Sequence, residues 1–170
     1  NGIPTDMITD LFMDKDNNLY VAFEYSGVYL LKKNATRLLP FFKADNTLGN
    51  SINAIAGDEE TIWLATNNGV YSVDLASGNI ENRSTNTGLP HNVINDILID
   101  EDGAVWIATR SSGIHCITED RSYNIDGGPK LEFVDMALDD DGNIWATTKE
   151  DGVFKFDQDS IAVFNSDNGL

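Results

Sequence analysis

The chain has 170 residues, enough for one domain with its own core, and 41% of them are hydrophobic against 23% charged. This composition argues against intrinsic disorder, and no apolar run approaches the roughly 20 residues that span a bilayer. Lys and Arg total 11 against 28 Asp and Glu, a formal charge of −17. Such a field repels a phosphate backbone and an anionic membrane surface, which disfavours nucleic acid and membrane as partners.

The single cysteine, Cys116, cannot form a disulfide within the chain. A cysteine-rich metal site needs several thiolates, so the sequence implies neither such a site nor any other cofactor. No general base lies beside Cys116 at a recognisable spacing, which argues against a nucleophilic role. We expect this cysteine on a mixed, half-exposed face.

Four related apolar segments follow one another along the chain. They are residues 19–23 (LYVAF), 62–66 (IWLAT), 105–109 (VWIAT) and 144–148 (IWATT). Their second residues recur at intervals of 43, 43 and 39 residues and form an aromatic column of Tyr20, Trp63, Trp106 and Trp145. A large flat side chain in every copy predicts buried layers between neighbouring sheets. The alternative interpretation is a row of platforms on which sugars stack.

An acidic turn precedes each of these strands, and a glycine follows each one. The turns begin at Asp14, Asp58, Asp100 and Asp139, and the glycines are Gly27, Gly69, Gly113 and Gly152. Aspartate caps a tight turn with its own side chain, and glycine takes the left-handed position. Because none of the acidic turns has the spacing of an EF-hand loop, turn chemistry explains them better than calcium does. The glycine column predicts a positive φ at the turn into each third strand.

The third copy shows the whole unit most clearly. Residues 93–99 are apolar and β-branched, and Asp-Gly at 102–103 is a hairpin signal; strands are then expected at 105–109, 114–117 and 122–125. No segment has sustained helical spacing. Four strands in about 42 residues, repeated without helices, predict an all-β protein, a β-propeller of four four-stranded blades. The blades are expected at approximately residues 1–44, 45–85, 86–127 and 128–170.

The two ends of the sequence share one lead-in, Asn1-Gly2-Ile3-Pro4 at the start and Asn168-Gly169-Leu170 at the end. Propellers have about 4–8 blades, and the shared lead-in favours four blades of a larger ring over a closed four-bladed ring. An open arc would expose the apolar faces of its first and last sheets. We therefore expect these faces to meet further blades or a second copy of the chain.

All four copies resemble the two-component regulator propeller repeat, and the third is closest to it, at residues 88–97, 100–103, 105–109 and 112–114. The first copy departs most, with Tyr20 in place of Trp; the second lacks the turn glycine and the fourth the Leu-Pro lead-in. The resemblance implies the periplasmic sensor region of a bacterial hybrid histidine kinase, which recognises an extracytoplasmic signal, often an oligosaccharide.

The loops between the second and third strands should share one face of the propeller with the segments that lead into each first strand. These loops differ between copies while the strands repeat, as recognition loops do. The candidate ligand-binding residues are Glu24, Tyr25, Asn67, Asn68, His91, Asn92, Arg110, Lys149 and Glu150. Arg110 is the sharpest candidate, because a guanidinium binds carboxylate or sulfate bidentately.

Two further columns are expected to be structural. His115 falls in line with Tyr29, Tyr71 and Phe154 and replaces an aromatic core residue. Asp10, Asp96 and Asp135 form a first-strand column that Ala54 interrupts, so we expect these aspartates to bond the backbone of a neighbouring blade rather than to ring a cation.

An enzyme would need paired carboxylates in a cleft, a nucleophile with its base, or metal-binding histidines. The many acids of this chain are scattered over turns and specify no reaction. The sequence therefore favours a non-enzymatic sensor propeller that binds a ligand such as a carbohydrate. The alternatives are a structural or protein-interaction scaffold without a small-molecule ligand and, less favoured, a propeller-type lyase or glycosidase.

Overall fold

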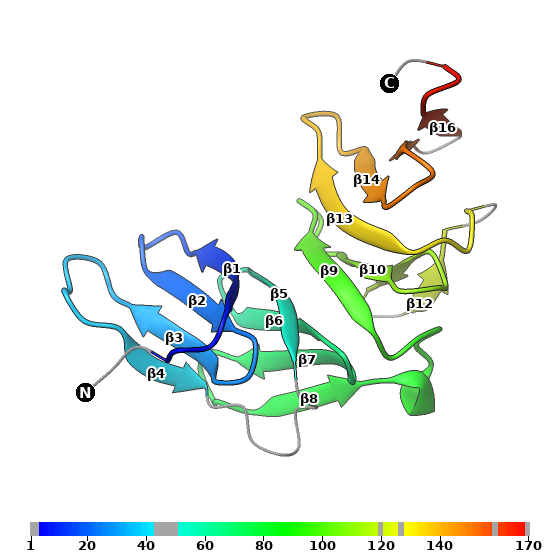
Figure 1. Ribbon diagram of the computed structural model, residues 1–170. Coiled ribbons are helices and arrows are strands. Elements are labelled where there is room, and N and C mark those ends of the chain that lie inside the picture. The colour runs from blue at the N-terminus through cyan, green and yellow to red at the C-terminus, as the bar shows by residue number, and fades with distance from the viewer. Residues whose placement is uncertain (1–3, 43–50, 119–120, 126–127, 158–159, 169–170) are drawn as a thin grey trace.

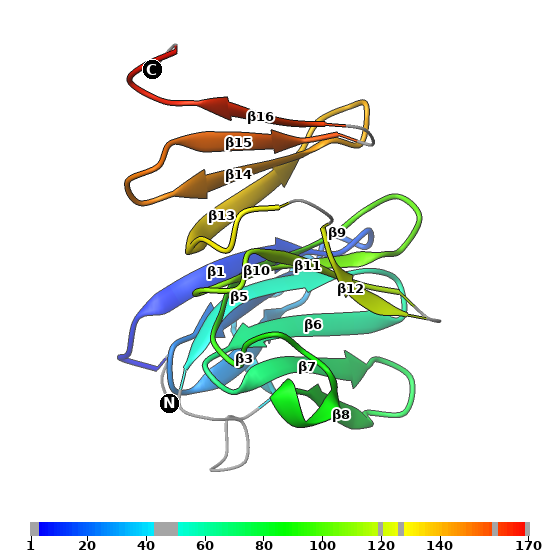
Figure 2. The ribbon, with the colours of Figure 1, turned by 90° about the vertical axis from the view of Figure 1, so that its right-hand side faces the viewer.

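Four four-stranded antiparallel sheets make up the computed structural model, which describes residues 4–42, 51–118, 121–125, 128–157 and 160–168. The sheets lie side by side in an open arc, with β1 (Ile8–Met13), β5 (Ile52–Gly57), β9 (Ile94–Ile99) and β13 (Phe133–Leu138) on its inner side (Figure 1). The sheet that begins with β13 forms one end of the molecule (Figure 2). The protein is therefore an all-β, partial β-propeller, as the repeats predict.

Within each sheet the strands are paired in chain order. The first blade continues with β2 (Leu19–Phe23), β3 (Gly27–Leu31) and β4 (Leu39–Phe42), and the second with β6 (Thr61–Thr66), β7 (Gly69–Asp74) and β8 (Ile80–Arg83). The third has β10 (Val105–Thr109), β11 (Ile114–Ile117) and β12 (Ser122–Asn124), and the fourth β14 (Ile144–Thr148), β15 (Val153–Phe156) and β16 (Ile161–Phe164). The described residues add one 3-10 turn, Thr85–Thr87, and include no helix that could cross a membrane. Each sheet lies within one of the four expected units, although the boundary at 44/45 falls outside the described residues.

The hydrophobic core lies between blades. One buried cluster joins the first and second sheets through Tyr20 and Ile55, a second joins the second and third through Ala65 and Ile97, and a third joins the third and fourth around Phe133. Each cluster draws on two consecutive sheets, so every blade depends on its neighbour for burial of its apolar face.

The aromatic column contributes to these clusters, but its members are not equally buried. Tyr20 is buried, as predicted, whereas the three tryptophans are only half-buried. The prediction of uniform burial was wrong because an indole is larger than a phenol and extends beyond the contact between sheets. Trp63 and Trp106 still pack against the clusters that their own blade shares with the next one.

In the third and fourth blades, the aspartate that opens the turn also holds the tryptophan side chain of its own blade. Asp100 Oδ1 accepts the backbone N–H groups of Asp102 and Ala104, at 3.0 and 2.9 Å, and its Oδ2 accepts the indole N–H of Trp106 at 2.7 Å. The fourth blade repeats the arrangement, with 2.9 Å from Trp145 Nε1 to Asp139 Oδ2. Trp145 and its neighbours hold the pKa of Asp139 below its usual value.

The second blade breaks this pattern because its turn is one residue shorter. Asp58 precedes Trp63 by five positions, whereas six separate the other pairs. Trp63 Nε1 is buried and has no hydrogen-bond partner among the described residues. The shorter turn of the second blade therefore leaves the indole N–H of Trp63 unpaired, whereas Trp106 and Trp145 donate to their aspartates.

The glycine column has the predicted backbone conformation, with φ of 90° at Gly27, 97° at Gly69, 80° at Gly113 and 99° at Gly152. The room for a side chain restricts this column as well as the backbone conformation. A Cβ atom at Gly69 would lie 2.1 Å from the carbonyl oxygen of Arg83 on the adjacent strand, so only glycine fits there.

Two of the three first-strand aspartates bond the next blade, as the sequence predicts. Asp10 Oδ2 accepts the N–H of Ile55 at 2.9 Å, and Asp96 Oδ2 accepts that of Met136 at 2.7 Å. Burial, and to a smaller degree the carboxylate of Asp135, raises the pKa of Asp96 to about 7. The bond between the third and fourth blades is therefore made by a carboxyl group that titrates near neutral pH.

The two indole environments predict unequal costs for the same substitution. Trp106→Phe removes the donor to the Asp100 carboxylate, a bond worth about 1.5–3 kcal/mol, whereas Trp63→Phe removes a donor that is already unpaired. We expect Trp106→Phe to lower the free energy of unfolding by about 1–3 kcal/mol more than Trp63→Phe, as measured by urea denaturation. An equal or larger loss in Trp63→Phe would contradict the assignment.

The raised pKa of the Asp96 carboxyl predicts that the stability of the fold depends on pH. The pKa of Asp96 is raised from 3.8 to about 7, so the folded state prefers the protonated carboxyl. Its contribution to stability is complete below about pH 4 and is lost as the pH rises through 7. Asp96→Asn keeps an acceptor for Met136 and removes the titration, so the stability of this variant relative to the wild type should increase between pH 4 and pH 8 in urea unfolding.

Asp10→Asn alters the corresponding bond to Ile55 and is the matched control for loss of a first-strand carboxylate. A stability difference between Asp96→Asn and the wild type that stays constant from pH 4 to pH 8 would rule out the titration.

Candidate functional site

The loops between the second and third strands meet at one mouth of the central channel. The first residues of these loops and parts of the first strands line a cavity of about 390 Å³ there. We call this cavity the channel mouth; its polar lining includes Glu24, Ser51, Asn67, Arg110, Glu132 and Lys149. The fold thus brings together four of the nine candidate residues, one from each blade: Glu24, Asn67, Arg110 and Lys149.

A threonine at the end of the second strand fixes the loop in three blades. Thr66 Oγ1 donates to the carbonyl oxygen of Gly69 at 2.8 Å and accepts the N–H of Asn68 at 2.9 Å. Thr109 and Thr148 make the same pair of bonds in the third and fourth blades. In these three blades the threonine hydroxyl holds the loop through backbone groups alone. The first side chain of the loop is therefore free to vary.

The first blade fixes its loop differently, because Phe23 occupies the position of the threonine. The Asp6 carboxylate instead accepts the N–H groups of Tyr25 and Ser26, at 2.7 and 3.0 Å, and the hydroxyl of Ser26 at 2.7 Å. These donors hold the pKa of Asp6 below its usual value even though desolvation opposes them.

Two cations and two carboxylates give the channel mouth its charge. Lys149 Nζ lies 2.9 Å from Glu132 Oε1 and, with a smaller contribution from Arg110, holds the pKa of Glu132 below its usual value. Arg110 is exposed, and its backbone N–H donates to the carbonyl oxygen of Val93 at 3.1 Å. A guanidinium and an ammonium in one cavity can bind an anion, while Glu24 can accept hydroxyl donors.

Asparagines of the first strands tie the blades together beneath these charges. Asn53 Nδ2 donates to the carbonyl oxygen of Ile94 at 2.7 Å, and Asn95 Nδ2 donates to that of Phe133 at 2.7 Å. The sequence interpretation missed these residues, together with Ser51 and Glu132. Asn53 and Asn95 share a position in their repeats, and that recurrence is the signal that could have identified them.

The other candidate residues do not line the channel mouth, and local bonds explain two of them. His91 Nδ1 accepts the N–H of Val93 at 2.9 Å, and Asn92 Oδ1 accepts that of Thr85 at 2.8 Å. Both side chains are used to shape the lead-in to the third blade. The remaining three lie outside the lining of the cavity: Tyr25, Asn68 and Glu150.

The residues with nucleophilic or metal-binding chemistry lie elsewhere. Cys116 is fully buried, so the expectation of a half-exposed face was wrong, and burial raises the pKa of its thiol. His115 is also buried; its ring nitrogens lie 2.8 Å from Asn124 Oδ1 and 2.5 Å from Ser122 Oγ, and burial lowers its pKa. Within the described ranges, no three His, Cys, Asp or Glu side chains are grouped to hold a metal ion.

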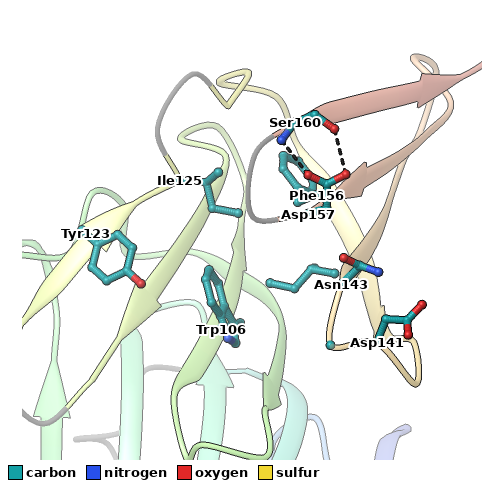
Figure 3. Close-up of a pocket in the computed structure, with 10 residues that line it drawn as sticks. Trp106, Tyr123, Ile125, Asp141, Asn143, Phe156, Asp157 and Ser160 are labelled. Carbon is teal, nitrogen blue, oxygen red and sulfur yellow. Dashed lines mark hydrogen bonds between the residues drawn. The ribbon is translucent and has the colours of Figure 1, made fainter.

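A second cavity, of about 680 Å³, lies between the third and fourth blades. Trp106 and Tyr123 face it from the third blade, and Asn143 and Asp141 lie on the side of the fourth (Figure 3). Some of its polar groups are used in turns; for example, Asp157 accepts the N–H and hydroxyl of Ser160, at 2.6 and 2.7 Å. We call this cavity the inter-blade groove.

A comparable cavity of about 520 Å³ surrounds Tyr20 and Phe41 between the first and second blades. Cavities of this kind therefore lie at two contacts between consecutive blades. The inter-blade groove is where the sugar-platform interpretation of Trp106 would apply, but its described lining includes no cationic side chain. The loop residues that line the channel mouth differ from blade to blade, which makes this cavity the better candidate for recognition.

Residues 88–111 match the family model described as "Two component regulator propeller". No curated protein matches the chain. Among solved structures, the extracellular domain of a hybrid two component system from B. thetaiotaomicron superimposes with a TM-score of 0.77 at 21% identity. That match covers 100% of this chain and 25% of the other, so this chain spans about a quarter of that domain.

Two other propellers show how widely the fold is shared. Virginiamycin B lyase from Staphylococcus aureus matches 97% of this chain and 57% of its own, with a TM-score of 0.76 at 16% identity. The computationally designed Ika4 protein matches 96% of this chain and 94% of its own, with a TM-score of 0.68 at 11% identity. At these identities the structures establish the fold alone. Residues 88–111, within the third blade, thus match the two component regulator propeller repeat, and the four blades form a partial β-propeller.

Proposed function

We propose that this chain is a non-enzymatic, ligand-recognising propeller segment of an extracytoplasmic two-component sensor. Its channel mouth binds an oligosaccharide that carries carboxylate or sulfate groups. Arg110 and Lys149 bind the anionic group, and Glu24, Asn67 and Ser51 accept or donate hydrogen bonds to the sugar hydroxyls. The repeat in the third blade supports the sensor role, since its family takes its name from two-component regulators.

One observation carries the choice of ligand. The chain has only 11 Lys and Arg among 39 charged residues, yet Arg110 and Lys149 of adjacent blades line the same cavity. Glu132 forms an ion pair with Lys149, and Arg110 is an exposed residue that lies close enough to lower the pKa of Glu132. The acidic surface of the chain repels anions, so two neighbouring cations in this cavity give an anionic ligand a place to bind that the rest of the surface does not offer.

The similarity to virginiamycin B lyase raises the alternative of an enzyme, although it extends to the fold only. The described lining of the channel mouth includes no histidine or cysteine, so a catalytic role would fall to Glu24, Glu132 or Lys149. A scaffold that binds no small molecule is the other alternative, and a ligand-binding experiment separates it from the proposal.

A galacturonate trimer and a sulfated disaccharide are suitable anionic ligands, with maltotriose as the neutral comparison. A ligand at about 100 times its Kd stabilises the folded state by about 2.7 kcal/mol, so the two anionic sugars should raise the Tm and maltotriose should not. Arg110→Ala should weaken binding by about ten-fold or more, because a hydrogen bond to a charged group contributes about 1.5–3 kcal/mol.

Arg37→Ala is the matched control, since Arg37 is exposed and lies outside the cavity. It should leave the Kd unchanged. Equal Kd values for the wild type and Arg110→Ala, or no rise in Tm with either anionic sugar, would contradict the proposed site.

A further inference from the structure

The inter-blade groove lies inside the arc, and its lining combines aromatic side chains with acids. Trp106 and Tyr123 line it from the third blade, and Ile144 and Phe156 from the fourth. Ile144 and Phe156 belong to the buried cluster that joins these two blades, so the groove is formed by a contact within the chain. Its volume of about 680 Å³ falls in the range of about 300–1,000 Å³ that is typical of sites for small molecules.

The charged side chains of the described lining are all acidic. Asp141 and Asp157 contribute carboxylates, and no Lys or Arg of the described residues lines the groove. Arg121 lies over the ring of Tyr123, at 4.7 Å from its centroid, but outside the lining. Asp141 is exposed and bonds Asp139 through its backbone N–H, and its carboxylate forms no ion pair with a described residue. The groove therefore attracts cations.

The corresponding cavity between the first and second blades carries its own cations. Lys15 and Lys32 line it, and Lys15 forms an ion pair with Glu59 that joins the two blades. In the turns of the third and fourth blades, the residues at the positions of Lys15 and Glu59 are Glu101 and Asp140. The inter-blade groove therefore lacks the internal cation that neutralises acids in the other cavity.

The tryptophans of the second and fourth blades already have a cation of the chain beside them. Arg83 lies 5.9 Å from the ring centroid of Trp63, and Lys155 lies 5.2 Å from that of Trp145. No Lys or Arg of the described residues lies over Trp106 in this way. The half-buried indole of Trp106 lines the groove instead, where its ring can attract a cation that enters from outside.

The fourth blade offers hydrogen-bond acceptors to the groove. Three side-chain donors of the lining are already bonded within the chain: Trp106 to Asp100, Asn143 to Asp139 and Ser160 to Asp157. The amide nitrogen of Asn143 is thus in use, which leaves its oxygen to accept a bond. Asn143 and the carboxylate of Asp141 lie on one side of the groove, across from Trp106 (Figure 3). A complementary ligand therefore brings N–H donors together with positive charge.

We propose that the inter-blade groove binds a small organic cation, an ammonium group on an apolar body. The ring of Trp106 contacts the cation, and the oxygens of Asp141 and Asn143 accept its N–H groups from the opposite side. The apolar body of the ligand packs on Tyr123 and Phe156. This site does not rest on the proposed function, because no residue that lines the groove also lines the channel mouth, and the two cavities select opposite charges.

Titration with phenethylammonium tests the site, with 2-phenylethanol as the neutral comparison and phenylacetate as the anionic one. Calorimetry should give a Kd for phenethylammonium at least about ten-fold lower than for either comparison, because only the cation engages the indole and the carboxylate. In NMR spectra of the indole N–H groups, the signal of Trp106 should shift more than those of Trp63 and Trp145, which lie outside the lining.

Asp141→Asn removes the charge of an exposed residue, so this variant should fold and raise the Kd for phenethylammonium by about three- to five-fold. Asp102→Asn is the matched control. Asp102 has the same position in the turn of the third blade and is also exposed, but it lies outside the lining, so this variant should leave the Kd unchanged.

Trp106→Leu removes the aromatic ring and should raise the Kd by about ten-fold. Trp63→Leu is its control, because it removes an indole outside the groove and should bind like the wild type. Circular dichroism verifies that both variants are folded at the temperature of the titration. Arg110→Ala should also bind phenethylammonium like the wild type, which separates this site from the channel mouth.

Three results would overturn the proposal. Equal Kd values for phenethylammonium and 2-phenylethanol, or no binding of phenethylammonium, would show that the groove does not select a cation. A Kd that rises as much in Asp102→Asn as in Asp141→Asn would mean general attraction to the acidic surface. Binding without a shift of the Trp106 indole signal would place the cation outside the groove.

Discussion

The whole structure depends on the contact between the outward face of one blade and the first strand of the next. A four-stranded sheet of this sequence is apolar on both faces, so no blade can bury its side chains alone. The three hydrophobic clusters accordingly lie between consecutive sheets. Asp10, Asn53, Asn95 and Asp96 add hydrogen bonds from one blade to the backbone of the next, and these bonds fix how adjacent blades are aligned.

Because stability comes from these contacts, the loops at the channel mouth are free to differ. Thr66, Thr109 and Thr148 hold three of the loops by backbone bonds that place no demand on the neighbouring side chains. A rigid scaffold with independently variable loops is the arrangement on which binding sites commonly develop. The positions occupied by Arg110 and Lys149 can therefore carry charge without cost to the fold.

Internal repetition predicted most of the fold, because a column of equivalent residues identifies strand, turn and register together. It could not predict burial equally well. Cys116 and the tryptophans were misjudged because exposure depends on the blade that packs against a side chain, which the pattern within one strand does not reveal. The unpaired indole of Trp63 was missed for a related reason. The alignment showed that the second turn lacks its glycine, but the role of Asp58 emerges only from the bonds that Asp100 and Asp139 make to their own indoles.

The sequence predicted which face of the propeller carries the candidate site, but it predicted only some of the residues that line the cavity. Short polar side chains beside free backbone N–H groups are captured locally, as His91 and Asn92 are. Long cationic side chains extend past their own backbone, and for that reason Arg110 and Lys149 line a shared cavity. Arg110 and Lys149 come from adjacent blades, so the bonds from Asn95 and Asp96 that align the third blade with the fourth also determine where these two cations meet.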